Sequence, residues 1–413
     1  MSRNLESTLP LIGTDTLDNG VRVICRQAPT RAEYFGVAVN SGSRDEAPGS
    51  FGLAHFVEHT IFKGTAKRRA CHIINRMEAV GGELNAFTSK EETYVYTVFP
   101  NGSLSRAAEL VSDLVRNSVF PEKELERERQ VVGDEMDSYL DTPAEAVFDD
   151  FEDMFFAGSQ LGHNILGSRQ ALENFTPAMC RHYLGRCFCG SRLTVFYLGP
   201  QPPARVAALV NRYFGDMPAG EPAVRLEPAV MAPRIERRDA PSHQANTVIG
   251  ARIGGVYAPD RHTVALLANI LGGPGMNSRL NVALRERRGL VYTVEASTTL
   301  YSDCGMFAVY YGCDPADNER CRDLVLGQFQ KLAATPLSRP ALEAAKRQYI
   351  GQLVVGSENL EQSAMTMART MMYFHRQPSM ESVVAAVNAV TSESLAEAAA
   401  RLRPELCSAL TLG

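Results

Sequence analysis

Apolar residues recur along the chain with two periods, one typical of strands and one typical of helices. Residues 21–27 and 34–42 are short runs rich in β-branched and aromatic residues, and they predict strands. Apolar positions with helical spacing follow over residues 104–120 and 122–140. Residues 85–99 alternate apolar and polar side chains and predict one extended strand. The pattern therefore predicts a fold that mixes strands with helices.

The order of these elements repeats in the second half of the chain. Residues 217–244 are rich in proline and charge, lack periodicity and predict a linker. Beyond them a strand, two helices, two strands, several helices and a final strand follow in the same order as before. Equivalent positions, such as Val37 and Gly250 or Leu198 and Leu412, are 213 or 214 residues apart. A constant offset over matched elements indicates two copies of one domain.

The predicted fold class is α+β, with two tandem homologous domains, each an antiparallel-rich sheet flanked by helices. A chain of 413 residues also exceeds the usual size of a single core. We expect an N-terminal domain over residues 1–216, a linker over 217–244 and a C-terminal domain over 245–413.

Composition excludes some classes of function. Apolar residues make up 45% of the chain and charged residues 22%, as is usual for a globular protein. A net charge of -5 gives no reason to expect nucleic acid or an anionic membrane surface as partner. No stretch is apolar for long enough to span a membrane, and the N-terminal residues have no apolar signal core. We expect no membrane partner.

The nine cysteines are scattered, and none forms a CxxC pair. This pattern favours a reducing compartment over a disulfide framework. Cys187 and Cys189 have the alternative interpretation of soft metal ligands, but isolated buried thiols are favoured. The sequence thus predicts a cytoplasmic protein.

The clearest chemical signal is GLAHFVEHTIFKGT, residues 52–65, where two histidines and a glutamate interrupt an apolar helix. His55 and His59 are four residues apart, so both imidazoles project from one face of the helix, as two ligands of one metal must. Glu58 can reach a water on that metal and act as its base. The alternative is a buried helix with satisfied polar residues. The repeated helix near VALLANILGG has no histidine or glutamate, so the fold does not require them.

A catalytic zinc needs a third protein ligand. Residues 122–140 offer five glutamates, and spacing alone does not choose among them. Glu128 and Glu135 are seven residues apart on one helical face, and we expect Glu135 to lie on the half-buried side. We therefore predict Glu135 as the ligand and Glu128 as a group that orients a ligand or the base.

These residues resemble the inverted zinc motif of the pitrilysin family, the inverzincins. The sequence HFVEH contains His55, Glu58 and His59, and Glu135 follows His59 by 76 residues. Segments such as HTIFKGT, GGELNAFTSKEETYVY, ERERQVVGDEM and SRLNVALRERRGLVYTVEA resemble family segments in the expected order. Within the family the likeness is to the beta subunit of mitochondrial processing peptidase and its bacterial relatives.

The resemblance implies roles for these residues and for others. His55, His59 and Glu135 would bind one zinc per chain, Glu58 would be the general base, and Glu128 would support them. The strand that begins at Asn85 would be an open sheet edge to which the substrate adds in extended form, with Asn85 and Ala86 at the scissile bond. The alternative for Asn85 is that it only begins the strand.

The resemblance also implies a contribution from the second half. Arg285 and Tyr292 match an arginine and a tyrosine that reach the substrate and stabilise the developing oxyanion. In the family, two such units close like a clamshell around a chamber, so each chain would form half of it. We expect a homodimer in which Arg285 and Tyr292 act in trans, with a zinc-free partner chain as the alternative. The glycine-rich residues 271–280 are interpreted as a helix end and a turn rather than a substrate-guiding loop.

The predicted function is that of a zinc endopeptidase acting on peptides or unfolded segments. One alternative is a processing peptidase for a dedicated precursor, which would differ in substrate and not in mechanism. The other is a noncatalytic assembly subunit, which the complete motif disfavours.

Overall fold

The computed structural model describes residues 11–413. Residues 1–10, part of the N-terminal stretch in which the sequence predicts no leader, lie outside the described residues. The chain forms two compact units, each made of separate segments. The first consists of residues up to Gly133, Ile165–Val224 and Ser357–Gln377, and the second of Asp134–Asn164, Arg225–Gly356 and Pro378–Gly413.

The first unit is built on a six-stranded sheet in the order β1-β2-β6-β3-β5-β4. Its strands are β1 (Leu11–Thr16), β2 (Arg22–Gln27), β3 (Ala32–Val39), β4 (Glu83–Thr88), β5 (Thr93–Pro100) and β6 (Leu193–Gly199). Its helices are α1 (Leu53–Thr60), α2 (Ala70–Glu78), α3 (Leu104–Asn117), α6 (Arg169–Glu173), α7 (Pro177–Cys187), α8 (Pro203–Phe214) and α12 (Leu360–Phe374), with α4 (Glu122–Leu140) running across the unit boundary.

The second unit is built on a five-stranded sheet in the order β7-β11-β8-β10-β9. Its strands are β7 (Ile235–Arg238), β8 (Ala245–Ile253), β9 (Val291–Leu300), β10 (Gly305–Cys313) and β11 (Ser408–Leu412). Its helices are α5 (Pro143–Phe155), α9 (Arg261–Gly272), α10 (Asn318–Ala334), α11 (Arg339–Gly356), α13 (Met380–Asn388) and α14 (Ser392–Ala400), with a π-helical segment at Asn281–Glu286.

The two sheets have the same topology, apart from the additional β1 in the first. Strands β2, β6, β3, β5 and β4 correspond in order and direction to β7, β11, β8, β10 and β9. The register agrees as well. Val37 lies opposite Val195 in the first sheet, and Gly250 lies opposite Ser408 in the second. Gly250 and Ser408 are each 213 positions after their counterparts, Val37 and Val195. The predicted α+β fold with two similar sheet-and-helix domains is confirmed.

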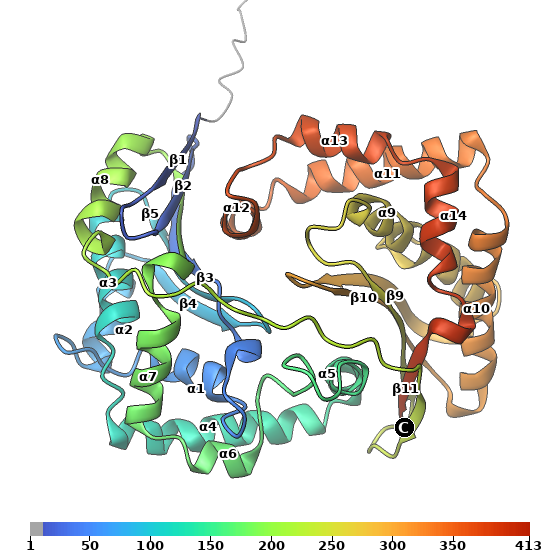
Figure 1. Cartoon of the computed structure of the whole chain (residues 1–413), viewed down its shortest axis with the longest axis horizontal. Coiled ribbons are helices and arrows are strands. Elements are labelled where there is room, and N and C mark those ends of the chain that lie inside the picture. The colour runs from blue at the N-terminus through green and yellow to red at the C-terminus, as the bar shows by residue number, and fades with distance from the viewer. Residues whose placement is uncertain (1–10) are drawn as a thin grey trace, which may run out of the picture. The chain divides into compact units, whose positions relative to one another are not determined.

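Each sheet is covered on one face by a helix from the other half of the sequence. Helix α12 packs on β2, β3 and β6, on the face opposite α3 and α8 (Figure 1). Helix α5 packs in the same way on β8 and β11. The two helices occupy equivalent places in the repeat, α5 after α4 and α12 after α11. The predicted limits, 1–216 and 245–413, place α5 in the N-terminal domain and α12 in the C-terminal domain, whereas contacts place each helix in the other unit. The domain limits stay a prediction.

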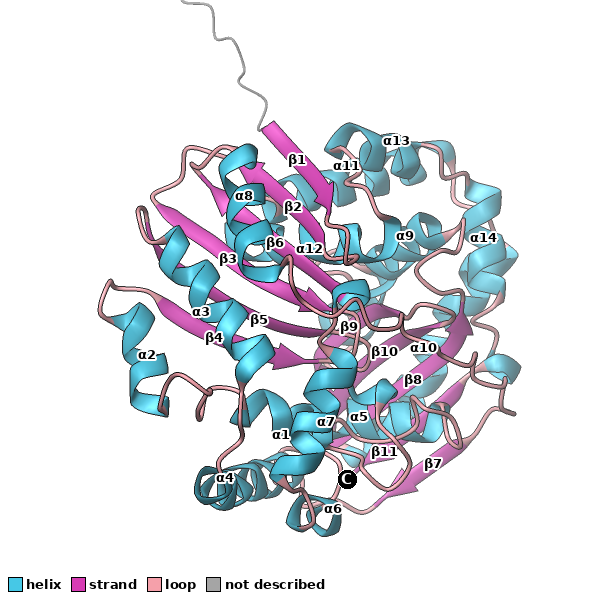
Figure 2. Cartoon of the chain, turned by 60° about the vertical axis from the view of Figure 1, so that its left-hand side comes forward, coloured by secondary structure: helices cyan, strands magenta, loops and turns pink. Residues whose placement is uncertain are grey.

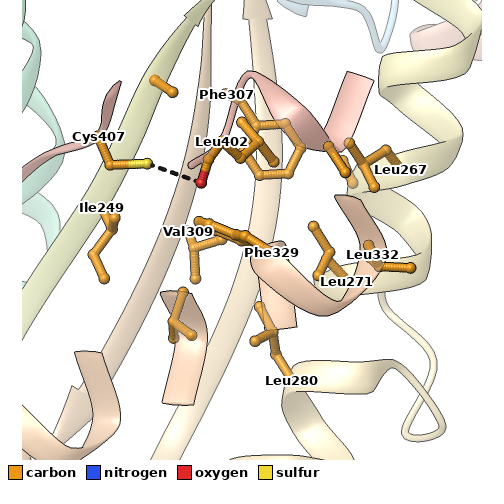
Figure 3. Close-up of a cluster of buried hydrophobic side chains, with 14 of the residues drawn as sticks. Ile249, Leu267, Leu271, Leu280, Phe307, Val309, Phe329, Leu332, Leu402 and Cys407 are labelled. Carbon is orange, nitrogen blue, oxygen red and sulfur yellow. Dashed lines mark hydrogen bonds between the residues drawn. The ribbon is translucent and has the colours of Figure 1, made fainter. Parts of the chain in front are cut away.

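Successive side chains along the strands point to opposite faces of the sheet, and those on both faces build the core of the second unit. On β10, Phe307 and Val309 face α9 and α10, whereas Met306 and Ala308 face α5. Figure 3 shows the first of these clusters, in which Phe307 and Val309 meet Leu271 and Phe329. Because both faces are apolar, the strand is buried along its whole length, as a sheet covered on both sides requires.

Two predictions about local structure are wrong. Residues 85–99 form a hairpin and not one strand: β4 ends at Thr88, and β5 begins at Thr93. The chain turns here because the Ser89 amide donates to the Glu92 carbonyl and the Glu92 amide donates to the Ser89 hydroxyl. The expected linker contains β7, which pairs in parallel with β11. Only one residue of β7 is apolar, so it is held through its backbone at the sheet edge and has no sequence periodicity.

Strand β4 lies at one edge of the first sheet and is paired on one side only, with β5 (Figure 2). All nine cysteines are free, and eight are buried, including Cys187 and Cys189. None of the helices between residues 11 and 413 has the length and apolar character needed to span a membrane.

Candidate metal centre

Helix α1 carries the histidine motif and is held at its N-terminus by a buried carboxylate. Leu53, Phe56 and Val57 are buried, so the apolar side of the helix packs into the unit. The Glu46 carboxylate accepts from the Gly52 amide at 3.0 Å and from the Ala54 amide at 2.6 Å. These amides have no partner inside the helix, and a negative charge also favours the positive end of the helix dipole. Glu46 thereby fixes the position of the turn that precedes His55.

Gly52 lets a second loop approach the start of α1. Its φ is +99°, and a Cβ there would lie 2.5 Å from the Leu166 carbonyl oxygen. Gly167 makes the reciprocal contact, because its own Cβ would lie 2.0 Å from the Phe51 carbonyl oxygen. Both positions therefore need glycine for conformation and for space. The backbone of the motif helix is fixed on two sides before any metal binds.

His55 and His59 lie one above the other on α1. Their ring centroids are 4.6 Å apart, and the ring planes are inclined by 69°. Burial, with a smaller contribution from His59, lowers the pKa of His55 to about 3. The imidazole of His55 is therefore neutral at physiological pH, which is the form that binds a metal. Glu58 lies between the two histidines in sequence and is half-buried.

Glu128 contacts the second histidine. Its Oε2 lies 3.4 Å from Nδ1 of His59, and its Oε1 accepts from Nζ of Lys63 at 2.6 Å. A carboxylate on Nδ1 favours the tautomer that leaves Nε2 free for a metal. Glu128 is buried and its charge is balanced by Lys63, so it is suited to this role.

Glu135 completes the cluster. A ligand atom of Glu135 and one of each histidine lie within 4.8 Å of one another. One continuous helix, α4, carries both Glu128 and Glu135. The unit boundary, between Gly133 and Asp134, falls inside this helix. Arg169 donates to the Gly133 carbonyl at 2.7 Å and holds this part of α4.

The expected half-buried position of Glu135 is wrong. Glu135 is exposed, whereas Glu128 is buried. Glu128 can be buried because Lys63 balances its charge and His59 contacts it. The Glu135 carboxylate is exposed, where a metal and its water would be accessible. The periodicity gave the correct face for Glu128 and the wrong environment for Glu135.

The donor set fits a zinc ion. Two imidazole nitrogens and one carboxylate oxygen form a common ligand set of catalytic zinc, which binds them at about 2.0–2.2 Å and keeps a fourth position for water. Ligand atoms of a tetrahedral zinc are about 3.5 Å apart. The ligand atoms of the three residues lie within 4.8 Å of one another, which is close to that separation.

Asn85 and Ala86 lie on β4, the edge strand that contacts α1. They are opposite Tyr96 and Val95 on β5, and both are half-buried. The free side of β4 therefore leaves these two residues next to an unpaired row of backbone groups, where another strand can add.

Arg285 and Tyr292 lie in the second unit, on the π-helical segment and on β9. Both side chains are exposed, Tyr292 by 67%. Strand β9 ends its sheet as β4 ends the first. The structure places these residues on a surface and does not by itself assign them to the metal centre.

Two supporting residues, Glu46 and Lys63, are not predicted from the sequence. Glu46 acts through a loop six residues before Gly52, a separation with no helical or strand period. Lys63 lies in the segment FKGT and acts on α4, far along the chain. Nothing local in the sequence indicates the partner of Lys63.

Comparison with known families and proteins agrees with this geometry. Residues 22–169 match the family model described as insulinase (peptidase family M16), and residues 174–349 match peptidase M16 inactive domain. The chain is 30% identical over 391 residues to an uncharacterized zinc protease of Streptomyces coelicolor, covering 92% of this chain and 84% of the relative. The chain belongs to peptidase family M16.

Other M16 relatives extend over nearly the whole chain. An uncharacterized zinc protease of Bacillus subtilis is 29% identical over 379 residues and covers 92% of each chain. The probable mitochondrial-processing peptidase subunit beta of Schizosaccharomyces pombe is 28% identical over 412 residues, covering 96% of this chain and 90% of the relative. These matches confirm the predicted family and support zinc as the cofactor.

Solved structures show the same fold. A protease from Helicobacter pylori superposes with a TM-score of 0.90 at 19% identity, covering 98% of this chain and 100% of that one. The peptidase M16 inactive domain from Pseudomonas fluorescens gives a TM-score of 0.90 at 18% identity. The fold is therefore one used by M16 proteins, and the intact HxxEH segment lies in the part matched by the first family model.

Proposed function

We propose that this chain is a zinc-dependent endopeptidase that hydrolyses peptides or unfolded segments. The observation that carries the proposal is the cluster of His55, His59 and Glu135, with ligand atoms within 4.8 Å of one another and with Glu58 on the same helix as both histidines. His55, His59 and Glu135 would hold a zinc ion, which would lower the pKa of a bound water toward about 7 and polarise the substrate carbonyl.

Glu58 is the general base in this proposal. Its carboxylate takes a proton from the attacking water as the water oxygen bonds to the carbonyl carbon. When the carbon–nitrogen bond breaks, Glu58 gives that proton to the leaving amine. Glu128 keeps His59 in the required tautomer through the contact to Nδ1.

The substrate binds in extended form along the free edge of β4, with Asn85 and Ala86 at the scissile bond. Backbone pairing of this kind tolerates many sequences, which suits a peptidase for varied peptides. The proposed assembly is a homodimer around an enclosed chamber, in which Arg285 and Tyr292 of one subunit stabilise the oxyanion at the other subunit's zinc. A processing role on one precursor is the second candidate, favoured by the likeness to the Schizosaccharomyces pombe subunit.

A reducing compartment, the cytoplasm, is the proposed location. It is supported by nine free cysteines, of which eight are buried and one, Cys71, is exposed. An exposed thiol of this kind remains reduced where glutathione and thioredoxin act.

Substitution of the base tests the proposed function. Glu58→Gln keeps the size of the side chain and leaves His55, His59 and Glu135 in place, so zinc content should stay at one per chain. Hydrolysis of a peptide library should fall by at least about 10³-fold, because no group then accepts the proton. Metal analysis and mass spectrometry of the digest measure both results. Cleavage by the variant at the wild-type rate would show that Glu58 is not the base.

A further inference from the structure

The turn between β4 and β5 buries two adjacent carboxylates. The side chain of Glu91 is 2% exposed and that of Glu92 is 10% exposed. Neighbouring buried carboxylates repel each other and lose their hydration, so they need compensating cations. Arg44 donates to Glu91 at 2.6 Å, and Arg369 donates to Glu92 at 2.6 Å. Each carboxylate therefore has an arginine of its own.

The second arginine comes from α12, in the other half of the sequence. Tyr373, one turn after Arg369, lies with its hydroxyl 3.1 Å from Glu91 and 3.0 Å from Glu92. The Arg369 guanidinium lies over the Tyr373 ring, 5.3 Å from its centre. Helix α12 thus supplies a cation and a hydroxyl to a turn that lies about 280 positions earlier in the chain.

The same turn is connected to the start of the metal-binding helix. The Ser43 amide donates to the Ser89 carbonyl at 3.1 Å, and the Arg44 amide donates to the Lys90 carbonyl at 2.8 Å. Two residues after Arg44, Glu46 holds the N-terminus of α1. Contacts therefore lead without a break from α12, through the turn, to the helix that carries His55.

Between α12 and the hairpin lies a hollow of about 530 Å³. Its lining includes Phe87, Tyr94, Tyr96, Glu361, Met365 and Arg369. Across a space of this size, α12 and the hairpin lack the close apolar packing that normally fixes two elements. The elements are joined across it by polar contacts, the Arg369–Glu92 ion pair and a hydrogen bond of 2.8 Å from the Tyr96 hydroxyl to Glu361.

We propose that Arg369 is a positioning residue for substrate binding. By holding Glu92, it fixes the β4–β5 hairpin and with it the free edge of β4 that receives the peptide. This inference rests on the proposed function for its link to substrate, but not for its effect on the hairpin. The second half of the sequence, which lacks the histidine motif, therefore contributes α12 to the unit that contains the motif.

The test compares peptide binding with stability. A fluorescein-labelled peptide that the wild-type protein cleaves is titrated into full-length protein with the Glu58→Gln change, so that binding is measured without turnover. Adding Arg369→Met should raise Kd about tenfold, the usual size of a coupled charge pair, and leave zinc content unchanged. Arg369→Lys keeps a cation near Glu92 and should recover part of the affinity. An unchanged Kd in Arg369→Met overturns the proposal.

A double variant separates positioning from folding. Arg369→Met alone leaves the Glu92 charge uncompensated and should lower the Tm. Adding Glu92→Gln removes that charge, so the Tm should recover, while the Kd should stay raised because the ion pair between Arg369 and Glu92 is still missing. If Kd recovers together with Tm, the role of Arg369 is purely structural and the proposal fails. Arg320→Met, which breaks an exposed pair with Asp317, is the matched control and should change neither quantity.

Hydrogen exchange keeps this test independent of the proposed function. Amides of residues 83–100 should exchange at least about tenfold faster in the double variant than in the wild type, since the hairpin is less well held. If the wild type cleaves no peptide, the proposed function fails and exchange alone decides the role of Arg369. Unchanged exchange in the double variant contradicts the proposal whatever the activity.

Discussion

At the scale of single residues, two side chains of the same type differ in their surroundings. Glu128 and Glu135 lie two turns apart on α4, yet one is buried against Lys63 and His59 and the other is exposed near both histidines. A buried, neutralised carboxylate orients its neighbour, whereas an exposed carboxylate can bind a metal that also holds water. The difference lies in distance and burial, which a helical period does not specify.

The two glutamates should respond differently to loss of charge. Glu135→Gln removes a proposed ligand from an exposed position, so zinc should be lost without a change in Tm of the metal-free protein. Glu128→Gln should keep zinc but bind it about 10–100-fold more weakly, because only the orientation of His59 suffers. Metal titration with a competing chelator measures both affinities. Full zinc affinity in Glu135→Gln would contradict its assignment as a ligand.

At the scale of elements, the position of α1 depends on contacts at its N-terminus. Glu46 binds the first amides of the helix, and Gly52 allows the backbone at Leu166 to lie against it. Neither contact belongs to the HxxEH motif. The motif nevertheless needs them, because a shift of about 1 Å at the first turn moves both histidines relative to Glu135.

Two glycines of the same loop provide a test. Gly49 and Gly52 both have positive φ, but a Cβ at Gly49 meets nothing within 4 Å, whereas a Cβ at Gly52 meets the Leu166 carbonyl. Gly49→Ala should lower the free energy of unfolding by about 1 kcal/mol, from backbone strain alone. Gly52→Ala should lower it by about 2–4 kcal/mol and weaken zinc binding. Urea denaturation checks the values. Equal losses in the two variants would show that the contact with Leu166 contributes nothing to the free energy of unfolding.

At the scale of the whole molecule, duplication explains the architecture, and only one copy has the histidine motif. In α9 the positions 213 after His55 and His59 are Ala268 and Gly272. Gly272 lies so close to β9 that a Cβ would be 2.5 Å from the Ala296 amide nitrogen. A histidine has no room there without displacing the strand. The second copy is therefore closely packed at the place where the first copy has its proposed metal ligands.

Mixing two defective chains tests whether sites are shared between subunits. Glu58→Gln lacks the base, and Arg285→Ala lacks the proposed oxyanion group. If Arg285 acts in trans, a mixed dimer has one intact site out of two, and an equal mixture should regain about a quarter of wild-type activity. Peptide cleavage after subunit exchange measures the recovery. No recovery, with exchange verified by mass spectrometry, would contradict the shared site.

Several features were predictable from the sequence because they depend on local periodicity or on its recurrence at a constant offset. The offset of 213 residues predicted two similar domains, and the helical spacing of His55 and His59 predicted one metal-binding face. The turn at residues 89–92 was missed because polar residues in a turn and polar residues on the exposed face of a strand look alike. Strand β7 was missed because an edge strand held by its backbone needs no apolar pattern.

The sequence by itself determined the mixed fold and the candidate ligands His55 and His59, because these depend on residues a few positions apart. It also determined the repeat, because the same order of elements recurs at a constant offset. Only the tertiary structure decided the exchange of α5 and α12, the pairing of Lys63 with Glu128 and the burial of Glu91 and Glu92. These features join segments that are distant in the chain. Their energies come from packing and charge compensation between elements, and no local spacing records which elements meet.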